Sequence, residues 1–534
     1  MPDYGSGMGD TPTFLNQLLP DFAFGKSGND RTPTSTAAPA EPAASPAARL
    51  GRSTPRDRTT MIMLAALLTV AFALRLAPAL FYPGINHPDE VFQSLEQAHR
   101  LVFGYGTIPW EFQYGTRSWL LPGMLAGLMW VGQLFGDSPD QYIGFIHVTL
   151  AALATTSVLC CFLWGERLGG RWGGLTAAAL PALWPDNIYF AARTLSESVA
   201  APLLVMVLYL VDTGSPTIAR RRLLLAGFLL GLSLTLRIQL APAAAVILLW
   251  SMVGGPRGRL LPLVVGAAVA LGLAGALDAV TWGYPFLSMW RNFVYNTYYG
   301  VSSYFGTEPW TFYPQVLFAY WGATAGLLVL LVCVGGLRLP LPFRVALVIL
   351  VTHSLIPHKE HRFIYPAILL LLIVAGIGMA QIGVWMAERG LARQRAASIG
   401  LVAASALLSL AVAASPHFRE LWQRGHGQVR AATYISSLSS VCGIGSYMTY
   451  GADVYFHRSI PYYWSYERAE FEHDLPAFNT TLTLASNPAV PGYEVRQCFD
   501  DVCVAQRAGT CQPLPVTQFP RPPSLPDFVQ PLTR

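Results

Sequence analysis

Long apolar runs constrain this chain more than any other feature of its sequence. About 20 consecutive apolar residues form a helix that crosses the hydrocarbon core of a bilayer, where each backbone polar group must be satisfied within the helix. Only 12% of the 534 residues are charged, about half the share found in soluble proteins. The chain is therefore predicted to be an all-α polytopic membrane protein with about 11 transmembrane helices. The predicted spans are 61–82, 141–164, 173–190, 195–211, 222–237, 239–253, 260–281, 315–337, 343–357, 364–386 and 398–414.

A further apolar segment, residues 118–136, is predicted to be a juxtamembrane or re-entrant helix rather than a helix that crosses the membrane. Its sequence is interrupted by Pro122 and four glycines, which weaken a helix. If it does not cross, the connections GERLGGRWGG, TGSPTIARRR, GGPRGR, RLPLPFR and ERGLARQR share one side, and each carries arginine. Arginine-bearing loops stay in the cytosol, so eleven spans with a cytosolic N-terminus fit the charge pattern.

The opposite, outer face receives nearly all of the unusual polar and aromatic segments. These are the long first outer loop 83–140 with its juxtamembrane helices, a second large loop 282–314, the turns FAARTLSES and HKEHRF, and a small C-terminal region, 416–534. Residues 61–415 form the predicted transmembrane domain. The protein is therefore predicted to work on its outer face.

The first 60 residues differ in composition from the rest of the chain. They are rich in Pro, Ala, Ser and Thr and show no apolar periodicity, which is typical of disorder. Arg49, Arg52, Arg56 and Arg58 crowd before the first span, and such a cluster keeps that end in the cytosol. Residues 1–60 are therefore predicted to be a disordered cytosolic tail, and the late, long first apolar run is not a secretory signal.

The cysteines divide between the apolar spans and the outer C-terminal region. Those in the outer region are Cys442, Cys498, Cys503 and Cys511. Because the outer compartment is oxidising, they are predicted to form one or two disulfides, whose pairing the sequence does not determine. No CxxC pair or histidine cluster indicates a metal site. The string NTT at Asn479 is a glycosylation acceptor if the outer face is a lumen of the endoplasmic reticulum.

The string HPDE, with Asp89 and Glu90, directly follows the first span. Pro88 suits the first turn of a helix and the two acids complement its dipole, so a purely structural helix start is one interpretation. The alternative is functional. A carboxylate pair beside a bilayer can reach a substrate that a lipid anchor holds at the surface.

The turn HKEHRF concentrates basic residues on the outer side, where they are otherwise sparse. His358, Lys359, His361 and Arg362 fall within five positions. Beside a membrane these residues can bind lipid headgroups without specificity. They can also clamp a phosphate, with Arg as a bidentate fork and Lys as a point charge, and the density of the motif favours this second interpretation.

Two further turns at the outer ends of spans carry polar residues. Arg193, Ser196 and Glu197 lie in FAARTLSESVA, and Arg237 and Gln239 lie in LTLRIQLAP. For both turns an interfacial helix cap competes with a role in substrate binding.

The loop 282–314 contains 13 aromatic residues. Aromatic belts at the membrane interface are the usual cause of such a composition. The alternative is that some rings stack on sugar faces while Asn292, Asn296 and Glu308 bind sugar hydroxyls.

Five strings that occur in a fixed order resemble glycosyltransferase family 22. They are HPDEVFQSLEQAHRLVFGYGTIPWEF, GTRSWLLP, RTLSES, YFGTEPWTFYP and HKEHRF, and the likeness covers most of residues 80–370. Members of this family are polytopic mannosyltransferases with the GT-C architecture, and the strings are most similar to those of the GPI mannosyltransferases. In the family the last string is usually HKEERF, so His361 stands where a glutamate is usual.

The resemblance implies an inverting transfer of mannose from polyprenyl-phosphate or dolichyl-phosphate mannose to a mannose-containing glycan or glycolipid, with an α-1,2 bond in the nearest relatives. It also implies that Asp89, with Glu90 beside it, supplies the catalytic base. In such a transfer a carboxylate takes the proton of the acceptor hydroxyl as its oxygen attacks the anomeric carbon, and the sugar passes through an oxocarbenium-like state. The implied partners are this donor, this acceptor and the lipid bilayer, and no nucleic acid.

The departing lipid phosphate needs cationic neighbours. The residues expected to bind this phosphate are His358, Lys359, His361, Arg362, Arg193 and Arg237. The residues expected to bind the sugar substrates are His87, Gln93, Glu197, Asn292, Asn296, Glu308 and Trp310. No metal or other cofactor is expected, because a monophosphate donor lacks the diphosphate that divalent ions usually bridge.

Two other functions compete with this prediction. One is a GT-C transferase that uses another sugar on a lipid phosphate. The other is a transporter or flippase of a lipid-linked substrate. Such proteins often show internal repeats and ionisable groups at mid-membrane, whereas this sequence shows no repeat and concentrates its charge in the outer loops. Its Ala- and Arg-rich, Lys-poor composition favours a bacterial inner membrane, with the endoplasmic reticulum membrane as the alternative.

Overall fold

The computed structural model describes residues 56–212, 218–253, 258–451, 453–465, 467–487, 490–512, 514 and 522–532. Residues 1–55, which make up most of the predicted cytosolic tail, lie outside the described residues. Among the described residues, the first helix starts at Arg58, where the Asp57 side chain accepts a hydrogen bond from the Thr60 N–H. Such a cap satisfies one of the free N–H groups of the first helical turn.

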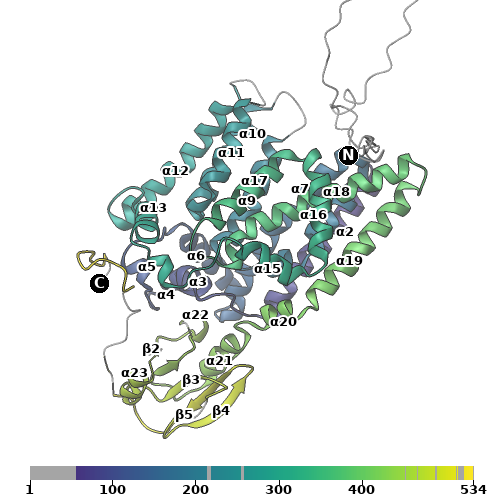
Figure 1. Ribbon diagram of the computed structural model, residues 1–534. Coiled ribbons are helices and arrows are strands. Elements are labelled where there is room, and N and C mark those ends of the chain that lie inside the picture. Colours follow the sequence, from purple (N-terminus) through teal and green to yellow (C-terminus); the bar gives the residue numbers. More distant parts are fainter. Residues whose placement is uncertain are drawn as a thin grey trace, which may run out of the picture. The chain divides into compact units, whose positions relative to one another are not determined.

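The described part of the chain is mostly helical (Figure 1). Its helices, with η marking 3-10 and π segments, are α2 (Arg58–Phe81), α3 (Pro88–Glu90), η2 (Val91–Leu95), α4 (Glu96–Phe103), α5 (Trp110–Gln113), α6 (Leu120–Gly132), η3 (Gln133–Phe135), α7 (Pro139–Leu183), α8 (Pro185–Tyr189), α9 (Ser196–Val211), α10 (Arg220–Leu236), η4 (Ile238–Leu240), α11 (Ala241–Val253), α12 (Leu260–Trp282), α13 (Leu287–Phe293), η5 (Val294–Tyr298), α14 (Val301–Tyr304), α15 (Phe312–Trp321), α16 (Thr324–Arg338), α17 (Pro340–Ser354), η6 (His361–Ile364), α18 (Tyr365–Glu388), α19 (Gln394–Ala413), α20 (Pro416–Gln423), α21 (His426–Ser437), α22 (Asp453–Phe456), α23 (Arg468–His473) and η7 (Leu475–Ala477).

Helices cover each of the eleven predicted spans, but fewer are long enough to cross a bilayer alone. Among the described residues, five meet the requirements of length and apolarity: α2, α7, α12, α18 with the preceding η6, and α19. Four further apolar helices have 10–17 residues. The multi-pass character is therefore clear, while the number of about 11 crossings stays a prediction.

One of the predicted spans differs in shape from its prediction, and the segment predicted not to cross keeps its predicted shape. Residues 315–337 are not one straight span, because α15 and α16 are bent by 112° at Gly322, whose φ of 56° ends the first helix. Residues 118–136 contain the helix α6, as predicted, and Pro122 does not interrupt it. That proline lies in the first turn of α6, where a missing N–H costs no helical hydrogen bond.

Several arginine-bearing segments come together at one end of the helical region. Arg56 donates to Glu166 over 2.8 Å, and Arg171 donates to Asp57 over 2.9 Å. The Gln394 side chain also donates to the backbone of the same connection. Of the segments predicted to share the cytosolic side, the residues before the first span, GERLGGRWGG and ERGLARQR therefore lie together. The placement of the other connections and the orientation in the membrane stay predictions.

Close backbone contacts at glycines hold two of the helix pairs together. Gly227 of α10 lies against Leu263 and Ala267 of α12, and Gly335 of α16 lies against Gly378 of α18. A Cβ atom on Gly227 would lie 1.9 Å from the carbonyl oxygen of Leu263. Small residues allow such close backbone approach, which stabilises helix pairs where no hydrophobic effect acts between them.

The C-terminal region contains a sheet, so the all-α prediction is wrong for this part of the chain. The strands are β1 (Ile444–Tyr447), β2 (Tyr462–Ser465), β3 (Thr480–Leu484), β4 (Glu494–Phe499) and β5 (Val502–Gln506), in the order β2-β1-β3-β5-β4. β1 pairs in parallel with β2 and β3, whereas β5 pairs antiparallel with β3 and β4. Helix α21 packs against β4 and β5, and α23 packs against β1 and β2 (Figure 1).

The four outer cysteines form two disulfides, as predicted. The pairs are Cys442–Cys511 and Cys498–Cys503. The prediction that Asn479 is a glycosylation acceptor is wrong, because this residue is 3% exposed. Its side chain accepts from the Cys442 N–H and donates to a backbone carbonyl, so its amide nitrogen is not available for glycosylation.

Candidate active site

The string HPDE begins a composite helix made of α3, η2 and α4. Pro88 occupies the first turn, and the His87 side chain caps it by accepting the Asp89 N–H over 3.2 Å. The chain then passes through the π-helix η2, a rare conformation that often occurs at functional sites. The interpretation of HPDE as a helix start is therefore correct for the backbone, but the two acids face different surroundings.

Asp89 is joined to the HKEHRF turn by Arg362. The Arg362 Nη2 donates to Asp89 Oδ2 over 2.6 Å, and its Nε donates to Glu360 Oε2 over 2.6 Å. The Arg362 side chain is 5% exposed, while 23% of the Asp89 side chain is exposed. A buried guanidinium shared between two carboxylates makes strong, directional hydrogen bonds, and this one fixes the position of Asp89.

A second arginine–carboxylate pair continues the network. Arg237 Nη1 donates to Glu197 Oε1 over 2.6 Å, and Arg362 Nη1 lies 3.7 Å from the same oxygen. Both Glu197 and Arg237 are almost fully buried. Buried charges persist only where they are paired. The network therefore draws together α3, the start of α9, the end of α10 and η6.

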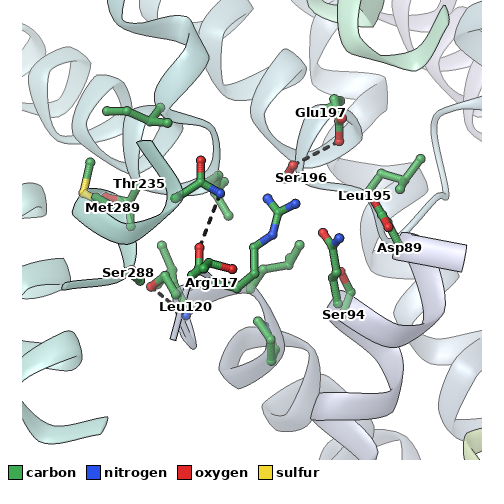
Figure 2. Close-up of a pocket in the computed structure, with 18 of the residues that line it drawn as sticks. Asp89, Ser94, Arg117, Leu120, Leu195, Ser196, Glu197, Thr235, Ser288 and Met289 are labelled. Atoms are coloured by element: carbon green, nitrogen blue, oxygen red, sulfur yellow. Dashed lines mark hydrogen bonds between the residues drawn. The ribbon is translucent and has the colours of Figure 1, made fainter. Parts of the chain in front are cut away.

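A pocket opens beside this network, with about 670 Å³ of space between its walls and in the solvent at its mouth. Its charged lining residues are Asp89, Glu197, Arg362 and Arg117. Its polar lining includes Gln93, Ser94, Ser118, Ser196 and Asn292, and its apolar lining consists of Leu120, Leu121, Pro122, Leu195, Leu236, Ile238 and Met289. Figure 2 shows the guanidinium of Arg117 pointing into the pocket, with Asp89 and Glu197 on one side and Leu120 and Met289 on the other.

Two acids near this pocket have pKa values that are shifted in opposite directions. Burial acts to raise the pKa of Asp89, but the charges of Arg362 and then His87 hold it well below its ordinary range. Burial and the charge of Asp89 raise the pKa of Glu111 to about 7, although Glu111 accepts a hydrogen bond from the Gln93 side chain over 2.7 Å. Opposed shifts in neighbouring acids are typical of catalytic sites.

Most of the basic residues in HKEHRF are occupied by partners within the protein. His358 Nε2 lies 3.1 Å from Glu360 Oε1, and Lys359 Nζ donates to the Glu308 backbone oxygen over 2.6 Å. His361 Nε2 lies 3.3 Å from Asp186 Oδ1. Of the four basic residues of this turn, Arg362 alone lines the pocket.

The two other arginines predicted to bind phosphate are also engaged and do not line the pocket. Arg193 donates to the Gly84 backbone oxygen and lies over the ring of Tyr189 at 4.3 Å. Arg237 is paired with Glu197, as described above. The prediction that these six cations bind phosphate is therefore unsupported by the position of any except Arg362.

Glu90 differs sharply from Asp89. Its carboxylate accepts the Asn86 N–H over 2.9 Å and lies 3.6 Å from Arg193. The Glu90 side chain is 5% exposed and does not line the pocket. The predicted role of Glu90 as a second catalytic acid is not supported by this position, because the residue closes the turn after α2.

The predicted sugar-binding residues divide into two groups. Gln93, Glu197 and Asn292 line the pocket, and His87 contacts Asp89 at its edge. The residues outside the pocket are Asn296, Glu308 and Trp310. Trp310 is 72% exposed, and their assignment as substrate ligands stays a prediction.

Three residues of the site were missed by the prediction from sequence. Glu360 lies inside HKEHRF but was passed over because only the basic residues of that turn were considered. Glu111 lies in IPWEF and Arg117 in GTRSWLLP. Both strings contribute to the family resemblance, so an acid or a base within such a string was the available signal.

Within the ranges that the structure describes, no group of three or more His, Cys, Asp or Glu residues is arranged to hold a metal ion. The carboxylates of the site are instead matched by arginines. Whether catalysis needs a metal ion is a separate question, and metal independence stays a prediction.

Comparison with known protein families identifies the class to which this helical membrane protein belongs. The model of the Alg9-like mannosyltransferase family matches residues 66–457. The chain therefore belongs to the Alg9-like mannosyltransferase family, and the protein is a glycosyltransferase of the multi-pass membrane type.

Curated relatives narrow the similarity to one branch of this family. GPI mannosyltransferase 3 of Yarrowia lipolytica is 29% identical over 420 residues, covering 74% of this chain and 76% of the relative. GPI mannosyltransferase 3 of Drosophila melanogaster is 30% identical, covering 57% of this chain and 54% of the relative. GPI alpha-1,2-mannosyltransferase 3 of Danio rerio is 26% identical, covering 56% of each chain. The chain thus spans little more than half the length of the last two.

Solved structures support the fold. ArnT from Cupriavidus metallidurans bound to undecaprenyl phosphate aligns with a TM-score of 0.58 at 13% identity, covering 85% of this chain and 99% of ArnT. ArnT in the apo state aligns with a TM-score of 0.52. At this identity the likeness establishes the GT-C fold and nothing about the substrate.

Proposed function

We propose that this protein is an inverting mannosyltransferase that moves mannose from polyprenyl-phosphate or dolichyl-phosphate mannose to a hydroxyl group of a lipid-linked or glycan acceptor. The observation that carries this proposal is the carboxylate of Asp89, which lines a partly apolar pocket and is kept ionised by Arg362. Membership in the mannosyltransferase family supports the choice of sugar.

The proposed reaction needs one base and one leaving group. The acceptor oxygen forms a bond to the anomeric carbon of mannose while the bond from that carbon to the phosphate oxygen breaks, and the bonding electrons leave with the phosphate. The acceptor hydroxyl gives its proton to Asp89. Because Oδ2 of Asp89 is held by Arg362, the proposed acceptor of the proton is Oδ1, which lies 3.4 Å from His87 Nδ1.

The arginine–carboxylate network supports this role of Asp89. With Arg362 fixed between Asp89, Glu360 and Glu197, the base is held in one position before the substrate arrives, and such preorganisation is a major source of catalytic rate. The low pKa of Asp89 makes it a weak base, but it is ionised throughout the neutral range, and it loses the accepted proton readily after transfer.

The position of the pocket between polar and apolar walls supports a lipid-linked donor. Leu120, Pro122 and Met289 lie on the side of α6 and α13, where isoprenoid carbons next to a phosphate find apolar contacts. The proposed site faces the outer side of the membrane, which agrees with the positive-inside pattern of the arginine-bearing connections. An α-1,2 bond and a metal-free reaction belong to the same proposal, the bond by analogy with the GPI relatives.

A GT-C transferase that uses a different sugar is the second candidate. It is favoured by the structural similarity to ArnT, whose structure contains undecaprenyl phosphate. Both candidates share a donor with a lipid monophosphate, so the sugar distinguishes them.

Purified protein in liposomes, supplied separately with polyprenyl-phosphate mannose and polyprenyl-phosphate glucose carrying radiolabelled sugars, tests the proposal. We expect label to move from the mannose donor to a mannose-terminated glycolipid acceptor, and the product to be cleaved by an α-mannosidase. Transfer from the glucose donor alone would favour the second candidate. Label that remains on both lipids with every acceptor offered would contradict both.

A further inference from the structure

Arg117 differs from every other charged residue of the pocket. Its guanidinium makes no hydrogen bond or ion pair with any residue in the part of the chain that the structure describes, and its Nε is buried without a partner. Arg362, in contrast, contacts the carboxylates of Asp89 and Glu360. Arg117 is therefore the pocket cation whose donors are still available.

The loop that carries Arg117 is held firmly in place by its backbone. The Thr116 N–H donates to the Glu111 carbonyl over 2.8 Å, and the Asn292 side chain donates to the Thr116 carbonyl over 3.3 Å. The indole N–H of Trp282 donates to the Arg117 carbonyl over 3.1 Å. These contacts anchor the loop to α5, α12 and α13 while the side chain extends into the pocket (Figure 2).

The guanidinium of Arg117 lacks a hydrogen-bond acceptor, which a ligand can provide. A buried donor without a partner costs free energy, and nearby carboxylates compensate only its charge. Its positive charge acts to lower the pKa of both Asp89 and Glu111, so it lies close to the acids of the site without a direct bond to them. The planar fork of a guanidinium matches the oxygens of a phosphate.

We propose that Arg117 binds the phosphate of the lipid-linked sugar donor, so that the GTRSWLLP loop rather than the HKEHRF turn holds the leaving group. This inference rests on the proposed function and names the residue that holds the phosphate of its donor. The cations of HKEHRF then serve to hold Glu360 and Asp89 in place. Arg117 supplies the positive charge that stabilises the phosphate as the sugar departs.

Binding of the leaving group by itself tests the inference without relying on turnover. The full-length protein in detergent is titrated with undecaprenyl phosphate and with undecaprenol, which lacks the phosphate. We expect the wild type to prefer the phosphate, and Arg117→Gln to lose roughly 10- to 100-fold of that preference, the value of a charge-assisted hydrogen-bond pair. Arg117→Lys is expected to retain part of it.

Arg291→Gln is the matched control. It removes the same charge from neighbouring α13, but the Arg291 guanidinium donates to the Tyr114 carbonyl over 2.8 Å and does not line the pocket. We expect this variant to keep the wild-type preference. A preference that is unchanged in Arg117→Gln and Arg117→Lys would overturn the inference and leave the proposed function intact. A wild type that binds undecaprenol as tightly as the phosphate would count against the proposed donor class itself.

A transfer assay separates the donor from the acceptor, since an anionic group on the acceptor has the same chemistry. Arg117→Lys, which keeps the charge and the loop, is expected to raise the KM for the donor and to leave the KM for the acceptor within about twofold. A rise that is confined to the acceptor KM would assign Arg117 to the acceptor and contradict the inference.

Discussion

Asp89 and Glu96 lie two turns apart on the same composite helix, and their surroundings are opposite. Asp89 is met by Arg362 at 2.6 Å. Glu96 is fully buried and is met by the N–H groups of Thr107 and Val454. Burial raises the pKa of Glu96 in spite of these hydrogen bonds, whereas the arginine holds the pKa of Asp89 low.

The difference shows that the counter-ion and the exposure of the side chain, rather than the residue type or the helix, decide what each acid can do. Glu96 has a second acid, Asp453, as its neighbour, and burial together with the charge of Glu96 raises the pKa of Asp453 to about 8. This pair retains a proton near neutral pH and connects the first outer loop to α22 of the C-terminal region. The ion pair of Asp89 and Arg362, in contrast, stays charged and lines the pocket.

Removing Arg362, the counter-ion of Asp89, is expected to have the largest effect on stability. Arg362→Gln leaves Asp89, Glu360 and Glu197 without their shared partner, and breaking a buried ion pair in this way costs about 3–5 kcal/mol. We expect a clear drop in melting temperature in detergent. Adding Glu360→Gln to this variant should recover part of the loss, because one of the stranded carboxylates becomes neutral. A melting temperature equal to that of the wild type would show that the network does not stabilise the site.

The protonated pair is tested by Asp453→Asn, with a smaller expected effect. Because the folded-state pKa of Asp453 lies above the ordinary value of 3.8, the folded protein holds a proton that the unfolded chain has lost, and stability falls as the pH rises toward about 8. Asparagine removes this dependence. The variant should therefore melt at a higher temperature than the wild type at pH 8.5, by a few degrees, with a smaller difference at pH 6.

Exposed Asp137 provides the control for this comparison. The difference in melting temperature between Asp137→Asn and the wild type should be the same at pH 6 and at pH 8.5. If Asp453→Asn instead lost stability at every pH, the ionised carboxylate would be the stabilising form and the comparison with Asp89 would fail.

Glu111 lies between the two extremes, and its effect is expected to be the smallest. Its pKa of about 7 means that it gains a negative charge beside Asp89 as the pH rises from 6 to 8, which weakens binding of an anionic donor. The donor KM of the wild type should rise several-fold over this range, and that of Glu111→Gln should stay level. Loss of all turnover in Glu111→Gln would instead identify Glu111 as the base.

The sequence predicted the helical part of the fold well because membrane spans depend on composition over some 20 residues, a signal that needs no tertiary information. The sheet of the C-terminal region was missed for the opposite reason. Its strands have four to six residues, and short apolar runs are ambiguous without knowledge of their partners.

For the site, the sequence located the segments but not the partners of each side chain. Asp89 and Arg362 were both selected from their motifs, yet their contact across 273 positions of sequence depends on how α3 and η6 pack. The basic turn suggested a phosphate site because its positive charges can be read from the sequence. The groups that pair with them, a backbone carbonyl for Lys359 and a carboxylate for His361, are contributed by distant segments. Arg117 was overlooked because its availability is a property of the folded pocket.

The measurement that tests the central claim most directly is single-turnover transfer of radiolabelled mannose from polyprenyl-phosphate mannose by Asp89→Asn and Glu90→Gln. Glu360 and Glu197 still neutralise Arg362 in Asp89→Asn, so this variant is expected to fold and to bind donor. We predict that it loses roughly 10²- to 10⁴-fold of the transfer rate, as expected for the removal of a general base, while Glu90→Gln keeps the rate of the wild type within about tenfold. Full transfer by Asp89→Asn would contradict the account.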